Sequence, residues 1–303
     1  MQLDHLGIIA ARGPDARRFL NGQLTQDVLA LRPERVELAG LCNAQGRLLA
    51  VLHLLPVGDQ DVLMILRREL LAGTLQTLRR FVLRAKVTLA DETPLWQLQG
   101  LFASDPEIAR ATGALAGDVG AAIEVAGALL WRHAADGRCI ALRPRAAQGA
   151  EADAEPFIAD PMWAARWHAA DIAAGLPVVY TATVGEFVAQ MQNLDAQGGI
   201  SFTKGCYTGQ EVVARAHYRG RVKRRLQRFL VSELRASEQP QEKDAATGQA
   251  AQSDWRIGDQ VKLADGRSAQ LADLGPTMIE PRECLAITTY ELPSLPLSYD
   301  LPE

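Results

Sequence analysis

Residues 204–211 read "KGCYTGQE", which joins a single cysteine to the expected start of a helix. Thr208 and Glu211 have the spacing of a capping box, in which the threonine hydroxyl accepts a hydrogen bond from the Glu211 amide at a helix N-terminus. Cys206 precedes that cap by two residues. The positive end of the helix dipole and the charge of Lys204 therefore both favour its thiolate form. The pattern predicts a thiol that is more reactive than a buried one.

Other roles for Cys206 remain open at this point. A lone cysteine is commonly a small hydrophobic residue of the core. His217 has no acidic neighbour at a spacing that would form a Cys–His catalytic pair, so the sequence gives little support to nucleophilic catalysis of the protease kind. The chain's four cysteines, at 42, 139, 206 and 284, form no CxxC pair and lack the ligand spacing of a zinc or iron–sulfur site. We therefore predict no metal site held by this chain alone and no disulfide framework.

A basic strip follows the expected helix in the run "RAHYRGRVKRR" (215–225). Its cationic residues are Arg215, Arg219, Arg221, Lys223, Arg224 and Arg225. Such a run is most often a solvated face. It also suits a local anion site for carboxylate or phosphate. RNA is a third candidate, although a platform for single strands needs more aromatic residues than Tyr218 alone.

The composition is that of an ordinary globular protein. The chain has 303 residues, 48% of them hydrophobic, and a formal net charge of −4, which argues against a nucleic-acid coat or a basic membrane binder. No apolar run reaches the roughly 18 residues that a membrane span needs, so we expect no membrane partner. The first residues lack the basic and apolar regions of a secretory signal, so we expect a cytoplasmic location.

Strand and helix signals alternate along the chain and indicate an α+β fold. Strands are expected at 3–11, 46–57, 61–67 and 86–92, and helices over 13–31, 68–87 and 161–177. The last helix should stop at Gly175, since Pro177 follows. From residue 226 onward, strands around a hairpin turn at Asp265–Gly266 predict a small all-β barrel. Residues 235–254 have no periodicity and few apolar residues, and we interpret them as a mobile insertion.

The signature stretch "NLDAQGGISFTKGCYTGQEVVARAHYRGRVKRRL" (193–226) resembles that of the YgfZ family. These are folate-binding proteins related to the glycine-cleavage T-protein, an aminomethyltransferase, and associated with iron–sulfur cluster maintenance. The resemblance extends to "GPDARRFLNGQLTQDV" (13–28), "DIAAGLPVV" (171–179), "EFVAQMQNL" (186–194) and "LPLSYDLPE" (295–303). It is weakest between about 95 and 160 and in the 235–254 insertion.

The resemblance implies a T-protein-like arrangement of three domains. Two α+β subdomains would make up residues 1–225, the first of them discontinuous, about 1–45 with 160–225, and the second about 46–159. A C-terminal β-barrel would follow at 226–303. Tetrahydrofolate, or a derivative of it, would sit in a central opening between the three.

The resemblance also implies a set of site residues. Cys206 would be the functional, catalytic cysteine, with Lys204, Tyr207, Gln210 and Glu211 as its companions in the motif. Polar contacts near the pterin are expected from Gln190 and Asn193. Because the glutamate tail of folate is anionic, we infer that the basic strip could meet it. The predicted folate-binding residues are Lys204, Tyr207, Gln190, Asn193, Glu211, Arg215, Arg221 and Lys223.

One departure from the transferase branch bears on the reaction. In "CNAQGRLLAVLHLL" (42–55), the aspartate pair of the transferases aligns with Ala50 and Val51, and no acidic residue lies between Glu37 and Asp59. Alanine and valine cannot act as a general acid or base, so glycine-cleavage transferase activity is not expected. The leading hypothesis is a folate-dependent accessory protein for assembly or repair of iron–sulfur clusters in client enzymes. The alternatives are a folate-dependent one-carbon transferase acting on an amine or tRNA, and a folate-storage module.

Overall fold

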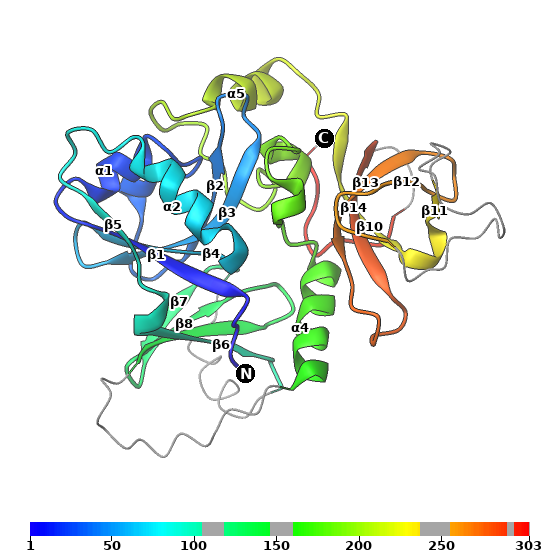
Figure 1. Ribbon diagram of the computed structural model, residues 1–303, viewed down its shortest axis with the longest axis horizontal. Helices are drawn as coiled ribbons and strands as arrows, with labels where there is room; N and C mark the ends of the chain where they lie inside the picture. The colour runs from blue at the N-terminus through cyan, green and yellow to red at the C-terminus, as the bar shows by residue number, and fades with distance from the viewer. Residues whose placement is uncertain (105–117, 146–159, 237–254, 290–293, 303) are drawn as a thin grey trace.

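The computed structural model describes residues 1–104, 118–145, 160–236, 255–289 and 294–302. Within them, three antiparallel sheets and a few helices form an α+β fold, as the sequence predicts. Figure 1 shows helix α4 (Pro161–Ala174) standing between the two N-terminal sheets and the C-terminal sheet. Among the described residues, no helix has the length and apolar character needed to cross a bilayer.

The first sheet contains five strands in the order β2-β3-β4-β1-β5. Their bounds are β1 Leu6–Arg12, β2 Glu37–Cys42, β3 Leu48–Val57, β4 Asp61–Arg67 and β5 Thr88–Asp91. Side chains alternate between its two faces, as strand geometry requires. On β1, Ile9 packs towards helices α1 (Ala16–Asn21) and α2 (Leu71–Arg79), whereas Ile8 packs towards the second sheet. Both faces of this sheet are therefore covered.

The second sheet has the order β6-β9-β8-β7. Its strands are β6 Trp96–Leu101, β7 Ala122–Val125, β8 Ala128–Arg132 and β9 Cys139–Pro144. Trp131 of β8 and Trp167 of α4 are buried in the core that joins this sheet to the first. Helix α4 begins at Asp160, whose side chain accepts from the Met162 amide, and ends at Gly175 in the left-handed conformation. The predicted end of this helix is confirmed.

The C-terminal sheet has five strands in the order β10-β14-β13-β12-β11. Their bounds are β10 Arg224–Leu230, β11 Arg235–Ala236, β12 Gln260–Lys262, β13 Ser268–Leu274 and β14 Glu283–Thr289. The expected β-barrel is wrong for the described residues: β10 and β11 are opposite edges of an open sheet and do not pair with each other. The predicted turn at Asp265–Gly266 does join β12 to β13, with Gly266 at φ +87°. Beyond Arg235 and Ala236, which form β11, the insertion expected at 235–254 lies outside the described residues.

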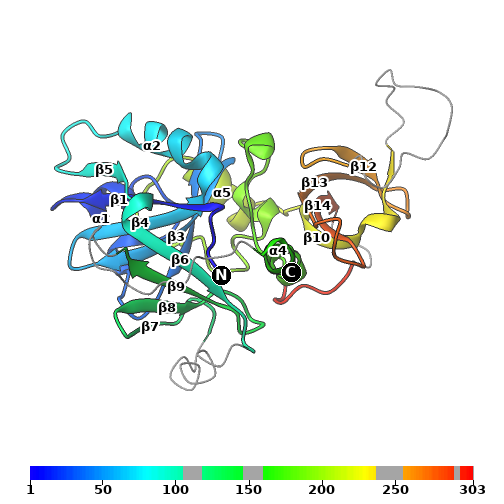
Figure 2. The same cartoon turned by 60° about the horizontal axis from the view of Figure 1, so that its bottom comes forward.

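Short 3-10 helices complete the described secondary structure: η1 Val28–Ala30, η2 Arg68–Leu70, η3 Thr93–Leu95, η4 Thr181–Thr183, η5 Ala189–Gln192 and η6 Val231–Glu233. Helix α5 (Gln210–Tyr218) lies beyond the turn between β2 and β3 (Figure 1). The C-terminal tail returns to the end of α4, where the Tyr299 hydroxyl donates to the Gly175 carbonyl at 2.7 Å (Figure 2). The C-terminal tail therefore packs against the end of α4.

Two predicted helices are shorter than expected because long-range contacts interrupt them. Over 13–31, α1 ends at Asn21, since Thr25 accepts a bond from the Gly40 amide of β2. Over 68–87, α2 ends at Arg79, and the Lys86 amide donates to the Asp15 side chain at 2.7 Å. These partners lie far along the chain, so local periodicity does not predict them.

The strand pairing does not follow the expected subdomain boundary near residue 45. Strands β2 and β3 pair across that point, and the two N-terminal sheets meet between β5 and β6 instead. The expected boundary therefore falls within one sheet, and the division of residues 1–225 into two subdomains stays a prediction. The contribution of 160–225 to a discontinuous first subdomain stays a prediction.

Candidate functional site

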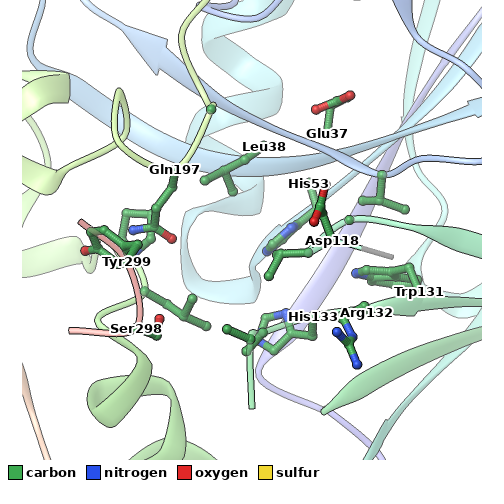
Figure 3. Close-up of a pocket in the computed structure, with 18 of the residues that line it drawn as sticks. Glu37, Leu38, His53, Asp118, Trp131, Arg132, His133, Gln197, Ser298 and Tyr299 are labelled. Atoms are coloured by element: carbon green, nitrogen blue, oxygen red, sulfur yellow. The ribbon is translucent and has the colours of Figure 1, made fainter. Parts of the chain in front are cut away.

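A central cavity of about 530 Å³ opens where the two N-terminal sheets, the end of α4 and the C-terminal tail meet. Its volume falls within the roughly 300–1,000 Å³ of small-molecule sites. Figure 3 shows two groups of side chains across the space, with Gln197, Ser298 and Tyr299 on one side and His53, Asp118, Trp131 and His133 on the other. Arg35, Glu37 and Arg132 also line it, as do backbone and apolar groups such as Gly120, Leu38, Leu176 and Pro177. The lining is therefore mixed, apolar with convergent polar groups.

His133 is held by an acidic partner from α4. Its Nε2 atom lies 3.3 Å from Asp171 Oδ1, and Arg138 Nη1 donates to the same oxygen at 2.5 Å. Burial works to raise the pKa of Asp171, but the hydrogen bond from His133 and the charge of Arg138 outweigh it and lower that pKa to about 2. Asp171 is therefore a permanent anion at neutral pH and a poor general base.

A smaller hollow of about 80 Å³ adjoins the cavity, and both are lined by His53 and His133. Val51 lines the small hollow, whereas Ala50 is fully buried in the core of the first sheet. Asp171 also lines it, but that carboxylate is committed to Arg138 and His133. Asp273, the other acidic residue that lines the small hollow, is bound by Tyr180 and His168. Neither of these two carboxylates is therefore free to take the place of the transferase aspartates that align with Ala50 and Val51.

The small hollow also reaches the C-terminal sheet. Asp273 of β13 accepts from the Tyr180 hydroxyl at 2.8 Å and lies 2.9 Å from His168 Nε2. Burial by itself lowers the pKa of His168, but the Asp273 carboxylate outweighs it and raises that pKa. These contacts hold α4 and the loop that follows it against β13, and so fix this side of the small hollow.

Cys206 is exposed, whereas the other three cysteines are buried. The predicted accessibility of its thiol is confirmed. Cys206 is not among the residues that line the central cavity. The thiol therefore lies at the surface, outside the central cavity.

The Lys204 side chain does not turn towards Cys206 or the cavity. Its ammonium donates to the carbonyl oxygens of Asn21, Leu24 and Gln26 at 2.5, 2.7 and 2.8 Å. Burial lowers the pKa of Lys204 to about 8, which leaves the ammonium, with its three donors, as the form present at neutral pH. Tyr207 is buried, with Lys204 Nζ 5.0 Å from its ring centroid. Both residues act in the fold of the signature stretch.

The predicted capping box is wrong. Helix α5 starts at Gln210, its N-cap is Gly209 at φ +83°, and no side chain caps it. A Cβ atom at Gly209 would lie 2.4 Å from the Asn43 carbonyl oxygen, so only glycine allows this close approach to the β2–β3 turn. Glu211 instead forms an exposed ion pair with Arg215 at 2.7 Å. Tertiary contact, which the local pattern does not contain, sets where this helix begins.

Gln190 and Asn193 connect parts of the fold and do not line the cavity. Gln190 Nε2 donates to the Val213 carbonyl of α5 at 2.6 Å. Asn193 Nδ2 donates to the Leu226 carbonyl at 2.9 Å and to the hydroxyl of Tyr299 at 3.1 Å. Tyr299 lines the cavity, so Asn193 affects the site only indirectly, through its hydrogen bond to the Tyr299 hydroxyl.

The basic strip contains one buried arginine and five exposed cations. Arg225 is buried and bound to both carboxylate oxygens of Asp195, at 3.0 and 2.9 Å. The remaining cations, Arg215, Arg219, Arg221, Lys223 and Arg224, are exposed and line no part of the central cavity. Their expected contact with folate stays a prediction that this geometry does not favour.

An aromatic cluster lies beside the exposed cations. His217 stacks on Phe202 with 3.7 Å between ring centroids, and Tyr218 meets both rings edge-on. Tyr218 is 65% exposed. The aromatic interleaving is therefore richer than the strip alone indicates, because Phe202 comes from the preceding loop.

Sequence reasoning missed the residues that line the central cavity. His53, His133 and Trp131 lie on strands or at strand ends, where their spacing carries no catalytic or binding motif. The sequence offered one signal. His133, one of five histidines in the chain, lies five residues before Arg138 in "RHAADGR", and Asp171 lies four residues before the predicted helix end at Gly175. Only the tertiary fold brings those two segments together.

Comparisons with known proteins agree with this fold. No family model matches the chain. Two curated relatives, the tRNA-modifying protein YgfZ of Escherichia fergusonii and that of Escherichia coli O157:H7, are each 34% identical over 271 residues, 88% of this chain and 82% of theirs. A crystal structure of glycine cleavage system aminomethyltransferase T from Bartonella henselae superposes with a TM-score of 0.58 at 13% identity, over 95% of this chain and 77% of that chain. At that identity the likeness concerns the fold alone.

Proposed function

The chain belongs to the YgfZ family, and from that membership we propose that it is a cytoplasmic accessory protein that binds tetrahydrofolate in its central cavity and serves assembly or repair of iron–sulfur clusters in client enzymes. One observation carries the proposal. A cavity of about 530 Å³ lies at the junction of the sheets in a T-protein-like fold, without a free carboxylate at positions 50 and 51.

The lining of the cavity fits a folate. Aromatic and imidazole rings line it, among them those of His53, His133 and Tyr299. A pterin ring carries both N–H donors and acceptors and has a flat face that suits aromatic walls. Arg132 and Arg35, which line the same cavity, are the cations nearest to the carboxylates of a glutamate tail bound there, although Arg35 also forms an ion pair with Glu37 at 3.0 Å. Tetrahydrofolate, when bound, supplies a carrier for one-carbon units.

The chain's own residues support folate binding, and positions 50 and 51 lack the carboxylates of the aminomethyltransferases. Asp171 is held ionised by Arg138, and Ala50 and Val51 cannot move a proton. We therefore assign the cavity to folate binding and Cys206 to thiol or cluster chemistry on a client protein. Because the Cys206 thiol is exposed, a partner's surface can reach it without entering the cavity.

Binding is tested by titrating purified protein with tetrahydrofolate under anaerobic conditions, by calorimetry. Arg132→Ala should weaken binding about tenfold or more, since a charge-assisted hydrogen bond to a carboxylate is lost. The matched controls Arg221→Ala and Lys223→Ala, on exposed cations outside the cavity, should leave the affinity unchanged. Absence of binding by the wild-type protein would overturn the proposal.

The role of Cys206 is tested in a strain that lacks the protein. Cys206→Ala should fold and bind tetrahydrofolate normally, because the side chain is exposed and outside the cavity. It should fail to restore the activity of iron–sulfur client enzymes. Full restoration would remove the thiol from the mechanism.

A second candidate function is a folate-dependent one-carbon transferase acting on an amine or on tRNA. It is favoured by the name of the curated relatives, tRNA-modifying protein, and by the exposed cations beside the Phe202, His217 and Tyr218 rings. Exposed aromatic rings and arginines are the groups that stack on and pair with RNA. Incubation with methylene-tetrahydrofolate and tRNA separates the candidates: stoichiometric consumption of the folate would favour the transferase.

A further inference from the structure

The loop that joins α2 to β5, residues 80–87, exposes apolar side chains among positive charges. Its sequence "RFVLRAKV" has three cations, and the chain has no acidic residue between Glu69 and Asp91, although its net charge is −4. Phe81 is 46% exposed and Leu83 is 86% exposed. The loop lies at the outer edge of the first sheet, away from α4 (Figure 1 and Figure 2), and lines no part of the central cavity. Folate binding therefore does not account for it.

The α2–β5 loop is anchored by contacts on its inner side. Val82, Ala85 and Val87 are partly buried and pack against the core of the first sheet. The backbone of Lys86 is bound to the start of α1, because its amide donates to the Asp15 side chain at 2.7 Å and its carbonyl accepts from the Asp15 amide at 3.3 Å. The exposed side chains therefore stand on a fixed backbone, and a partner that covers them does not have to order the loop first.

The cationic side chains of this loop form no ion pair in the part of the chain that the structure describes. Arg80, Arg84 and Lys86 are all exposed, and none of them lies within reach of a described carboxylate. By contrast, the exposed Arg215 is paired with Glu211 at 2.7 Å. The positive field of the loop is therefore open to a negatively charged partner.

The combination of apolar and cationic groups indicates the kind of partner. A cationic run alone would be an ordinary solvated face, and one exposed leucine alone would need no explanation. Aromatic residues and arginine are enriched where proteins meet, with apolar anchors in pockets and guanidinium groups that pair with carboxylates. Together, these groups fit an apolar hollow with an acidic rim on another protein.

Two other classes of partner fit the loop less well. Leu83, the more exposed of its two apolar residues, has no flat face on which a nucleic-acid base could stack. Two short apolar side chains also bury less surface than the single acyl chain that gives only marginal membrane binding. The observations therefore favour a protein over RNA or a lipid surface.

We propose that the α2–β5 loop docks on a client enzyme, with Leu83 and Phe81 in an apolar hollow of that enzyme and the loop's cations paired with carboxylates around the hollow. The inference rests on the proposed function, because it names the partner as one of the iron–sulfur clients. Since the loop lies outside the central cavity, the protein can hold folate there while the client is bound.

The loop is tested first in a strain that lacks the protein, with the activity of its iron–sulfur enzymes as the readout. Leu83→Ser and the double variant Arg80→Glu/Arg84→Glu should fold, because the changed side chains are exposed. Both should bind tetrahydrofolate as the wild type does, because the loop lies outside the cavity. We expect each to restore client activity at least about tenfold less effectively than the wild type.

Two matched controls change similar side chains elsewhere. Leu29→Ser replaces another exposed leucine, 57% exposed, and Arg256→Glu reverses an exposed charge near the C-terminal sheet. Both should restore client activity fully. Full restoration by Leu83→Ser and by the double charge variant would overturn the inference.

Direct binding is measured by calorimetry with a purified iron–sulfur enzyme whose activity falls in that strain. Its affinity for the wild-type protein should fall at least about tenfold in either loop variant, and should fall as the salt concentration rises, because exposed ion pairs are screened. Binding of the wild type to phosphatidylserine vesicles, or self-association in the ultracentrifuge, that is lost in Leu83→Ser would assign the loop to a membrane or to a second copy and overturn the inference.

The outcomes separate this inference from the proposed function. If Cys206→Ala fails to restore client activity whereas both loop variants restore it, the inference alone fails. If no iron–sulfur enzyme loses activity in the strain, the proposed function fails, and the inference fails with it because its partner does not exist.

Discussion

The Lys204 ammonium lies 2.7 Å from the Leu24 carbonyl oxygen, across 180 positions of sequence. The same ammonium also meets the carbonyl oxygens of Asn21 and Gln26. It therefore fastens the signature stretch to the loop between α1 and η1. The three donors of the ammonium match three carbonyl oxygens there.

Replacing Lys204 should destabilise the fold. Lys204→Met leaves three carbonyls without a donor, and we expect the free energy of unfolding to fall by about 3 kcal/mol or more. Urea denaturation followed by circular dichroism measures the change. The matched control, Lys223→Met at an exposed lysine, should change stability by less than about 0.5 kcal/mol. Equal effects of the two variants would contradict the structural role of Lys204.

Local sequence patterns predicted a structural feature correctly where the residues of one short segment determine it. The helix that ends at Gly175, the turn at Gly266 and the accessible thiol of Cys206 are all confirmed. The capping box failed because the Asn43 carbonyl approaches Gly209 so closely that it sets the helix start. That contact joins distant segments, which no local spacing encodes.

The candidate site was harder to predict than the fold. The signature stretch resembles that of the family, but Lys204 and Asn193 within it and Gln190 just before it donate hydrogen bonds to other groups of the protein. The cavity is lined instead by strand residues such as His53 and Trp131, whose alternation reads as ordinary core. Only the pairing of the sheets turns these positions into a site.

Cys206 should be the one thiol that reacts rapidly in the native protein. Burial raises the pKa of Cys42 to about 12, and burial followed by Asp273 raises that of Cys284 to about 12; Cys139 is buried as well. We expect one fast equivalent with a chromogenic disulfide reagent in native protein and four after unfolding in denaturant.

Cys206→Ser should remove the fast equivalent and leave stability within about 0.5 kcal/mol of wild type. Cys139→Ala, at a buried position, is the matched control and should leave the fast equivalent in place. A fast reaction that persists in Cys206→Ser would show that another cysteine is the accessible one.

The buried pair of Asp195 and Arg225 should contribute far more than the exposed pair of Glu211 and Arg215. The side chains of the first pair are 8% and 6% exposed, and those of the second 83% and 70%. Asp195→Ala leaves a buried guanidinium unpaired, and we expect a loss of about 3–5 kcal/mol in the free energy of unfolding. Glu211→Ala should cost less than about 1 kcal/mol. Denaturant unfolding of the two variants side by side measures the difference, and similar losses would contradict this assignment.

His53 should make the protein less stable as the pH falls. Burial first, and then the nearby His133, lowers the pKa of His53 to about 3. In the unfolded chain a histidine titrates near about 6.5, so below that pH the unfolded state binds a proton that the folded state does not. The stability that this depressed pKa contributes is full above pH 6.5 and is lost as the pH falls towards 3.

Removing the imidazole isolates this contribution. Between pH 7 and pH 5 a single such group costs at most about 2 kcal/mol, less where cavity water reaches the half-buried ring. His168, whose pKa is raised by Asp273, acts in the opposite sense, since its contribution is present below its unfolded pKa and lost as the pH rises. The slope of stability against pH should therefore be compared between wild type and His53→Gln, in which His168 is unchanged. We expect the fall in the free energy of unfolding from pH 7 to pH 5 to be smaller in the variant, and an identical fall in both proteins would show that His53 takes up its proton as readily in the folded state as in the unfolded one.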